Sequence, residues 1–247
     1  MSRIDGRAET ALRPIEIQLG FMKNPPGSVL YRAGGTTVLV NASVVDEAPE
    51  WLAGGGWLTA EYHMHPCAGP KRDGGTKKRK GPDGRATEIQ RLIGRTLRAG
   101  VHLESIGPRT IVLDCDVLEA DGGTRTACIN AGSIATALTL DWMRRKGMIG
   151  SGVLRNLICA ISVGRVGGKN MVDLCYVEDS KAELDLNVVG TEGGLVAEIQ
   201  GAAEGPPVPR HEIDALVDLA LGAFPSIADA QRQALSGIDL QKLQGAK

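Results

Sequence analysis

The residues best suited to chemistry lie at 121–126, where the sequence reads Asp-Gly-Gly-Thr-Arg-Thr. A strand-like run over 109–118 precedes them, and small or apolar residues at helical spacing predict a helix that continues to about residue 146. The glycines let backbone amides approach a ligand, and the first amides of a helix lack intrahelical acceptors. Arg125 adds a flat donor fork at the positive end of the helix dipole. The stretch suits a phosphate group, although a tight turn capped by Thr124 explains the same pattern.

A second candidate phosphate ligand is Arg85, which follows a glycine at the start of a predicted helix over 85–101. Ile89, Leu92, Ile93 and Leu97 form the stripe expected to be buried. Three further arginines, at 91, 95 and 98, have the spacing that places side chains on one helix face. That face either extends an anion-binding surface or is simply exposed.

Positive charge is concentrated between residues 71 and 98, which hold ten basic and three acidic residues, whereas the whole chain carries a net charge of −1. The loop over 66–84 is rich in Gly, Pro, Lys and Arg and cannot form a core. This asymmetry predicts a polyanion contacted at one place, and a solvated loop is the alternative. The candidate contacts are Lys71, Arg72, Lys77, Lys78, Arg79 and Arg91.

Five carboxylates lie between residues 173 and 187. In a strand beginning at residue 182, Leu184, Leu186 and Val188 would face one side, and Glu183, Asp185 and Asn187 the other. Asp179 lies in the turn before this strand and can fold back towards Asp185. Two hard oxygen ligands with room for water suit Mg²⁺, which often bridges to phosphate. A strand with a solvated acidic face is the alternative.

Three other patterns are weaker. Residues 164–170 resemble a P-loop but are one residue short, which favours a hairpin turn. A zinc site at His63, His65 and Cys67 would need a fourth ligand such as His102. Cys128 lies near a predicted helix N-terminus, where its pKa could be lowered, but the pattern favours a buried thiol.

The predicted elements that position these residues alternate between strands and helices along the chain. Strands are expected at 14–20, 28–32, 36–45, 57–64, 156–166, 170–176, 182–191 and 195–201, with glycine turns at 34–35, 167–168 and 192–194. Two helices are expected at the end, over about 210–223 and 226–236. The order predicts an α+β fold, one domain over 1–247 with two similar halves.

Composition narrows the class of protein. The 247 residues are 43% hydrophobic but only 3% aromatic, so the core must be largely aliphatic. The five cysteines include no C-x-x-C pair, which favours reduced thiols. The sequence shows neither an apolar run long enough to span a bilayer nor a signal peptide, and we therefore expect a cytoplasmic protein.

Several long motifs, in order, resemble the ribonuclease PH family of phosphate-dependent 3′-to-5′ exoribonucleases, relatives of the exosome ring subunits. The resemblance runs nearly end to end. The motifs lie at residues 5–7, 12–14, 27–30, 59–62, 84–94, 113–118, 120–127, 176–182, 185–189 and 200–205. The family fold is a two-part α+β domain with βαβα-like halves, assembled as a hexamer of three dimers. The resemblance therefore implies a homohexamer.

The resemblance also implies residue roles. Arg85 and the turn Gly123-Thr124-Arg125 match the positions that hold inorganic phosphate, and Arg72 matches an arginine that holds the RNA 3′ end. Asp179 and Asp185 match the acidic pair associated with metal, either Mg²⁺ or Mn²⁺, and with catalysis. The implied enzyme is a nucleotidyltransferase that reversibly trims 3′ ends and releases nucleoside diphosphates. The implied RNA is a tRNA precursor, with rRNA as a second candidate.

The sequence departs from the family pattern in the basic loop and beside the acidic pair. Cys67 and Gly75 stand where arginines are usual, and Cys175 stands where an acidic residue is usual. Lysines in the loop would hold phosphates as point charges without a bidentate fork. These departures keep open an alternative, a catalytically inactive ring subunit that only binds RNA. A hydrolytic nuclease is disfavoured because it has no use for a free-phosphate pocket.

Overall fold

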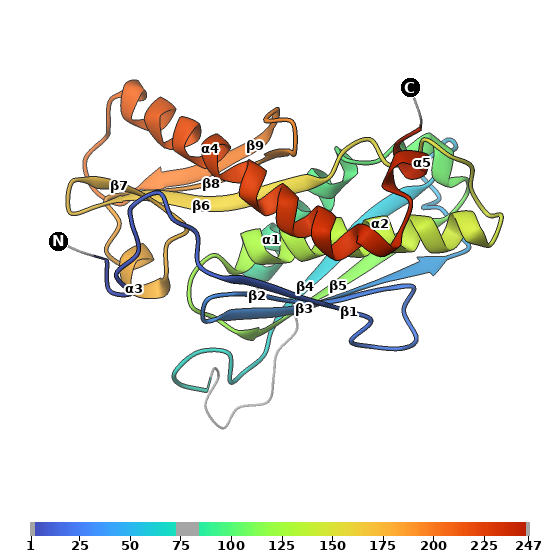
Figure 1. The fold of residues 1–247 in the computed structure, drawn as a ribbon, viewed down its shortest axis with the longest axis horizontal. Coiled ribbons are helices and arrows are strands. Elements are labelled where there is room, and N and C mark those ends of the chain that lie inside the picture. The colour runs from blue at the N-terminus through green and yellow to red at the C-terminus, as the bar shows by residue number, and fades with distance from the viewer. Residues whose placement is uncertain (1–2, 73–83, 246–247) are drawn as a thin grey trace.

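The structure, a computed structural model, describes residues 3–72 and 84–245. Its first half is a five-stranded sheet with two long helices packed on one face (Figure 1). The strands, in their order across the sheet, are β1 (Ile15–Leu19), β2 (Gly27–Ala33), β3 (Thr36–Val45), β5 (Thr110–Glu119) and β4 (Trp57–Met64). The helices are α1 (Gly84–Arg98) and α2 (Thr124–Arg145), and a 3-10 turn, η1 (Leu103–Ile106), follows α1.

The edge strand β4 and its neighbour β5 alternate between buried and partly exposed residues, as half-buried strands must. They pair in parallel, whereas the other neighbours in this sheet are antiparallel. A parallel pair needs a crossover connection, and the segment containing α1 provides it. The order β4-α1-β5-α2 therefore brings the start of α2 to the end of β5, where the Gly122-Gly123 turn lies.

The second half is an antiparallel four-stranded sheet with one long helix packed on it. Its strands, in order across the sheet, are β7 (Lys169–Val172), β6 (Ile158–Val166), β8 (Leu184–Thr191) and β9 (Val196–Ala203). The helices are the single-turn α3 (Tyr176–Asp179), the long α4 (Arg210–Ala234) and α5 (Leu240–Gln244), with a 3-10 turn, η2 (Leu235–Gly237), after α4. Within the described residues, no helix has both the length and the apolar character needed to cross a membrane.

Helix α2 joins the two halves, because it packs on β2 and β3 of the first sheet and on β6 of the second (Figure 1). Small residues make the close packing on β2 possible: a Cβ at Gly27 of β2 would collide with the backbone carbonyl of Ala135 in α2. Asn130 acts as a strand partner, since its Oδ1 accepts from the backbone N–H of Ala160 at 2.8 Å and its Nδ2 donates to the carbonyl of Ala160 at 2.9 Å. Because Asn130 Nδ2 also lies 3.5 Å from the Tyr31 hydroxyl of β2, the N-terminal half of α2 is tied to both sheets.

Most predicted elements are confirmed, including the α+β class and the glycine turns at 34–35 and 167–168. Two predictions are wrong. Tyr176 does not end a strand but begins the single turn α3. The two C-terminal helices are one, because α4 continues through Pro225. Pro225 is exposed, and the buried stripe that includes Phe224 and Ile227 holds both sides of it against the sheet.

Candidate active site

The predicted phosphate turn lies where β5 ends and α2 begins. Gly122 and Gly123 both have positive φ, 76° and 64°. A Cβ at Gly122 would lie 2.5 Å from the carbonyl oxygen of Leu174, so this position requires glycine. Thr124 does not cap the helix as the alternative interpretation supposed, because Gly123 is the N-cap and no side chain caps it. Instead, the hydroxyls of Thr124 and Tyr62 share a hydrogen bond of 3.1 Å.

Hydrogen bonds from neighbouring segments fix the conformation of this turn. The Thr36 hydroxyl donates to the Gly122 carbonyl at 2.6 Å and accepts from the Asp121 amide at 2.9 Å. The Asp121 carboxylate accepts from the Tyr176 amide at 3.1 Å, which connects the turn to α3. The carbonyls are thus engaged, and the first amides of α2, which have no intrahelical acceptors, are left for a ligand.

Arg125, in the first turn of α2, is largely buried and held in place by neighbours that sequence reasoning missed. Its Nη1 donates to Gln200 Oε1 at 2.6 Å and lies 3.9 Å from Glu88 Oε1. Gln200 in turn donates to the same Glu88 oxygen at 2.7 Å. Because Gln200 is on β9 and Glu88 on α1, this chain of contacts joins three elements around the guanidinium.

Arg85 is the second residue of α1 and is exposed. The positive charges of Arg85 and Arg125 both influence the pKa values of two other residues, Tyr62 and Asp179. Burial raises the pKa of Tyr62 to about 12, and the charges of Arg85 and Arg125 limit that rise. Burial also raises the pKa of Asp179, and the same two arginines oppose the shift. The structure therefore brings both predicted phosphate arginines close to one of the predicted carboxylates.

The second carboxylate, Asp185, is the second residue of β8. Burial, followed by the charge of Asp179, raises the pKa of Asp185 to about 6, and Arg125 acts in the opposite direction. Its Oδ1 is buried and has no hydrogen-bond partner among the described residues. A buried, unsatisfied carboxylate oxygen beside another carboxylate is the donor arrangement that a hard cation would satisfy.

The two aspartates would have to hold such a cation with water and phosphate, because the described residues contain no group of three or more His, Cys, Asp or Glu suited to a metal ion. This includes the zinc site considered at His63, His65 and Cys67. The His65 ring nitrogen Nδ1 instead accepts from the Cys67 amide at 3.2 Å. Mg²⁺ and Mn²⁺ accept water and phosphate oxygens readily, so the pair fits either ion.

The two other weak patterns have structural explanations. Residues 164–170 form the β6–β7 hairpin, as the spacing favoured. Cys128 is fully buried, and a hydrogen bond with it raises the pKa of Cys115, so these two cysteines belong to the core.

The basic candidates are only partly described. Lys77, Lys78 and Arg79, like Gly75, lie outside the described residues. Lys71, Arg72 and Arg91 are exposed. Of the two interpretations left open for the arginine face, an extended anion-binding surface does not fit its other two members, Arg95 and Arg98, because their guanidinium groups have protein partners. Arg95 forms a bidentate ion pair with Glu198 of β9. Arg98 donates to the Leu58 carbonyl at 3.0 Å and lies 4.3 Å from the centre of the Trp57 ring.

A buried ionic network beside the site was also missed. Arg3 makes two hydrogen bonds to Glu178, of 2.9 and 2.7 Å, which tie the N-terminal segment to α3. Arg13 pairs with Asp173 at 2.7 Å. Arginine and aspartate are usually exposed, so neither residue type signals burial by itself. Their places beside the motifs at 12–14 and 176–182 were the available indication.

Comparisons with known proteins agree with this geometry. Residues 11–139 match the model of the 3′ exoribonuclease family, domain 1, and residues 156–223 match that of domain 2. The chain is 48% identical to "Ribonuclease PH" of Mycobacterium bovis (strain BCG / Pasteur 1173P2) over 237 residues, 95% of this chain and 92% of that protein.

Two solved structures share the fold. Rrp46 of rice (Oryza sativa) has a TM-score of 0.77 at 18% identity and covers 94% of this chain and 100% of that one. The Archaeoglobus fulgidus exosome with RNA bound to the active site has a TM-score of 0.76 at 22% identity and covers 93% of this chain and 92% of that one. The fold defines a two-part α+β protein in which Arg125 of the first half contacts Gln200 of the second. The chain belongs to the 3′ exoribonuclease family.

Proposed function

We propose that inorganic phosphate binds between Arg85, Arg125 and the first amides of α2, and attacks the last phosphodiester of an RNA 3′ end. The chain is a phosphorolytic 3′-to-5′ exoribonuclease, a nucleotidyltransferase of the ribonuclease PH type. The observation that carries the mechanism is the meeting of two arginines with a carboxylate pair, in which one buried oxygen lacks a partner. A site that joins two anions needs such positive charge before it can bring them together.

The chemistry replaces a phosphodiester bond of the RNA with the phosphoanhydride bond of a nucleoside diphosphate. An oxygen of the bound phosphate forms a bond to the phosphorus of the terminal phosphodiester, and the bond to the 3′ oxygen of the preceding nucleotide breaks. That 3′ oxygen takes up a proton and becomes the new RNA end, and the released product is a nucleoside 5′-diphosphate. Because the phosphoanhydride of a nucleoside diphosphate can in turn be attacked by a 3′ hydroxyl, which restores the phosphodiester and releases phosphate, the reaction runs backwards when diphosphates are abundant.

The protein contributes position and charge. The amides of the turn and the fork of Arg125 orient the attacking phosphate, and Gln200 and Glu88 hold that fork in place. Asp179 and Asp185 would hold Mg²⁺ or Mn²⁺, which when bound would neutralise charge on the reacting phosphate and the leaving oxygen. Asp179 and Asp185 are also the candidates for supplying the proton to that oxygen.

The substrate proposed is the 3′ trailer of tRNA precursors, with rRNA as a second candidate, and the site of action is the cytoplasm. Exposed Lys71, Arg72 and Arg91, together with the loop outside the described residues, would contact the RNA backbone. We also propose a homohexamer, a trimer of dimers. Support for RNA contact and for a ring assembly comes from the fold shared with an exosome that has RNA bound to its active site.

The alternative, an inactive ring subunit, is less well supported. An inactive subunit would not need to maintain a buried carboxylate at an energetic cost, yet burial and the neighbouring charge of Asp179 raise the pKa of Asp185. It would also have no need for a glycine turn that leaves helix amides available between two arginines.

The test is to incubate the protein with Mg²⁺ and a short RNA with a single-stranded 3′ tail, with and without inorganic phosphate, and to identify the released nucleotides. We expect nucleoside diphosphates only when phosphate is present. Monophosphates without added phosphate would mean hydrolysis. RNA binding without any release would favour the inactive subunit.

A further inference from the structure

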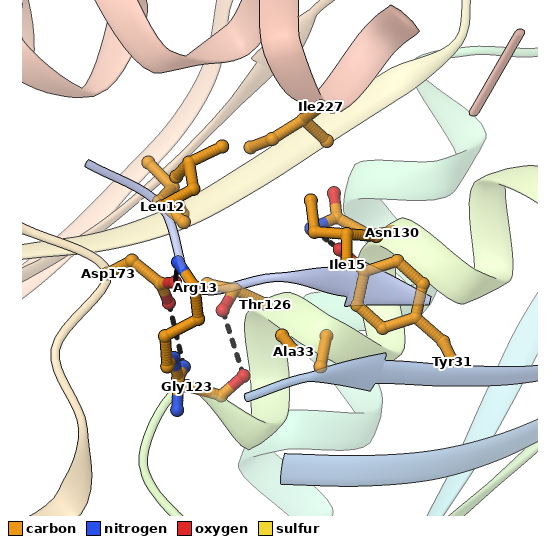
Figure 2. Close-up of a pocket in the computed structure, with 12 residues that line it drawn as sticks. Leu12, Arg13, Ile15, Tyr31, Ala33, Gly123, Thr126, Asn130, Asp173 and Ile227 are labelled. Carbon is orange, nitrogen blue, oxygen red and sulfur yellow. Dashed lines mark hydrogen bonds and ion pairs between the residues drawn. The ribbon is translucent and has the colours of Figure 1, made fainter. Parts of the chain in front are cut away.

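A single buried ion pair connects the phosphate turn to the loop that leads into the catalytic helix α3. Arg13 and Asp173 have side-chain exposures of only 4% and 6%. Both oxygens of Asp173 are used: Oδ1 accepts from Arg13 Nη2 at 2.7 Å, and Oδ2 accepts from the Arg13 backbone amide at 2.7 Å. Figure 2 shows the Arg13 side chain extending from Asp173 towards Gly123.

The far end of Arg13 binds the phosphate turn itself. Its Nη1 donates to the Asp121 carbonyl at 2.5 Å, and its Nη2 lies 3.4 Å from the Gly122 carbonyl. These carbonyls precede the amides that would bind phosphate. One guanidinium therefore binds the turn of the first half and the aspartate of the second half at once, which a planar fork can do and an ammonium cannot.

The backbone conformation of Asp173 is stabilised by contacts with its surroundings. Its φ of 57° makes it the one residue other than glycine with positive φ in the described part of the chain. Such conformations persist when neighbouring contacts determine them, and they gather at functional sites. Here the amides of Asp173 and Leu174 donate to Ser162, at 2.7 Å to its carbonyl and 3.2 Å to its hydroxyl. Tyr176, the first residue of α3, follows two residues after Leu174.

We propose that Arg13 and Asp173 are positioning residues that fix the distance between the bound phosphate and Asp179. The pair touches neither phosphate nor RNA. Its effect is to hold the turn and α3 in one arrangement, so that the nucleophile and the carboxylate face the same phosphodiester. The inference rests on the proposed phosphorolysis. Because misplacement of reacting groups by about 1 Å costs about a hundredfold in rate, a loosened pair should act on turnover more than on phosphate binding.

The test is Asp173→Asn, which keeps the shape of the side chain but removes its charge and one acceptor. The matched control is Asp141→Asn, because Asp141 is 3% exposed, accepts from Arg144 at 2.9 Å and pairs with Arg145 at 2.8 Å. It lies near the other end of α2, seventeen residues after Thr124 and therefore about 25 Å along the helix. The two variants match in substitution, in burial and in the number of arginine partners, because Asp173 Oδ2 also lies 3.7 Å from Arg7 Nη1.

In phosphorolysis assays at varied phosphate, we expect Asp173→Asn to lower kcat about tenfold or more while the KM for phosphate changes less than about threefold. Asp141→Asn should keep kcat within about twofold of the wild type. Arg13→Lys, which keeps the charge but lacks the fork, should repeat the loss of kcat and serves as the second variant if Asp173→Asn does not fold.

Three results would overturn the inference: unchanged kcat in folded Asp173→Asn or Arg13→Lys, a rise in KM with kcat preserved, or an equal loss of kcat in Asp141→Asn. The last would show a general effect of lost stability. Failure of the proposed function is distinguishable, because the wild-type protein itself would then release no nucleoside diphosphate.

Discussion

Asp185→Asn should make the metal-free protein more stable while abolishing its activity. Burial and the charge of Asp179 raise the pKa of Asp185 from 3.8 to about 6 in the folded state. The folded state therefore binds this proton more tightly than the unfolded state does. The stabilisation that comes from this tighter proton binding is fully present below the pKa of the unfolded state and is lost as pH rises through the pKa of the folded state. At neutral pH the ionised Asp185 therefore lowers the free energy of unfolding. The asparagine variant carries no such charge.

The size of the effect follows from the shift. Each unit of pKa corresponds to about 1.4 kcal/mol, which gives about 3 kcal/mol as an upper value. The side chain is not fully buried, and an asparagine leaves its own polar atoms to be satisfied, so about 1–3 kcal/mol is the expected gain. For a chain of this length that gain corresponds to a rise in Tm of a few degrees to about 10 °C.

The assay is thermal unfolding in EDTA at equal protein concentrations, followed from about pH 4 to about pH 7.5. The two proteins should differ most at the upper end and least near about pH 4, where Asp185 is protonated in the folded state and close to half protonated in the unfolded state. Asp218→Asn on α4, which changes an exposed carboxylate, is the control and should melt with the wild type. If Asp185→Asn melted at or below the wild-type temperature near pH 7.5, the assignment of Asp185 as a strained, buried charge would be refuted.

The remaining predictions concern the phosphate turn, the RNA surface and the long C-terminal helix. Arg125→Ala should lower turnover about a hundredfold at fixed phosphate, and near-normal phosphorolysis by a folded variant would contradict its role. Gly122→Ala should destabilise the protein by about 1–3 kcal/mol in urea unfolding, because φ is 76° and the Leu174 carbonyl is in the way. Lys71→Gln should reduce the slope of log affinity for single-stranded RNA against log salt by about 0.7, and an unchanged slope would exclude it as a phosphate contact. Pro225→Ala should stabilise the protein by about 1–3 kcal/mol, since it restores a backbone donor inside α4, and a lower urea midpoint would show that the proline is required there.

The sequence predicts the local parts of this site well, because each depends on a short pattern. The change from a period of 2 residues to one of 3.6 residues locates the strand-to-helix turn at Gly122-Gly123. The period of 2 residues also directs Leu184 and Leu186 into the core. Errors occurred where packing decided the outcome. Pro225 reads as a helix break, yet the buried residues on either side of it keep α4 continuous.

What the sequence could not show is how the two halves meet. Arg13 and Asp173 are 160 residues apart, and Arg125 and Gln200 are 75 apart. No period links such pairs, and a charged residue in a strand or loop is ordinarily expected to be exposed.

Arg95 is a second residue whose partner in the folded protein the sequence could not show. Its spacing left open whether its helix face binds anions or is simply exposed, and the structure shows its guanidinium paired with Glu198 of the second sheet. The residues proposed to bind substrate are thus suggested by local sequence patterns, whereas those that hold the two halves of the site together are determined by the tertiary fold. A variant that weakens this second group should leave phosphate affinity nearly intact and reduce turnover, because the reacting groups remain present but are no longer aligned.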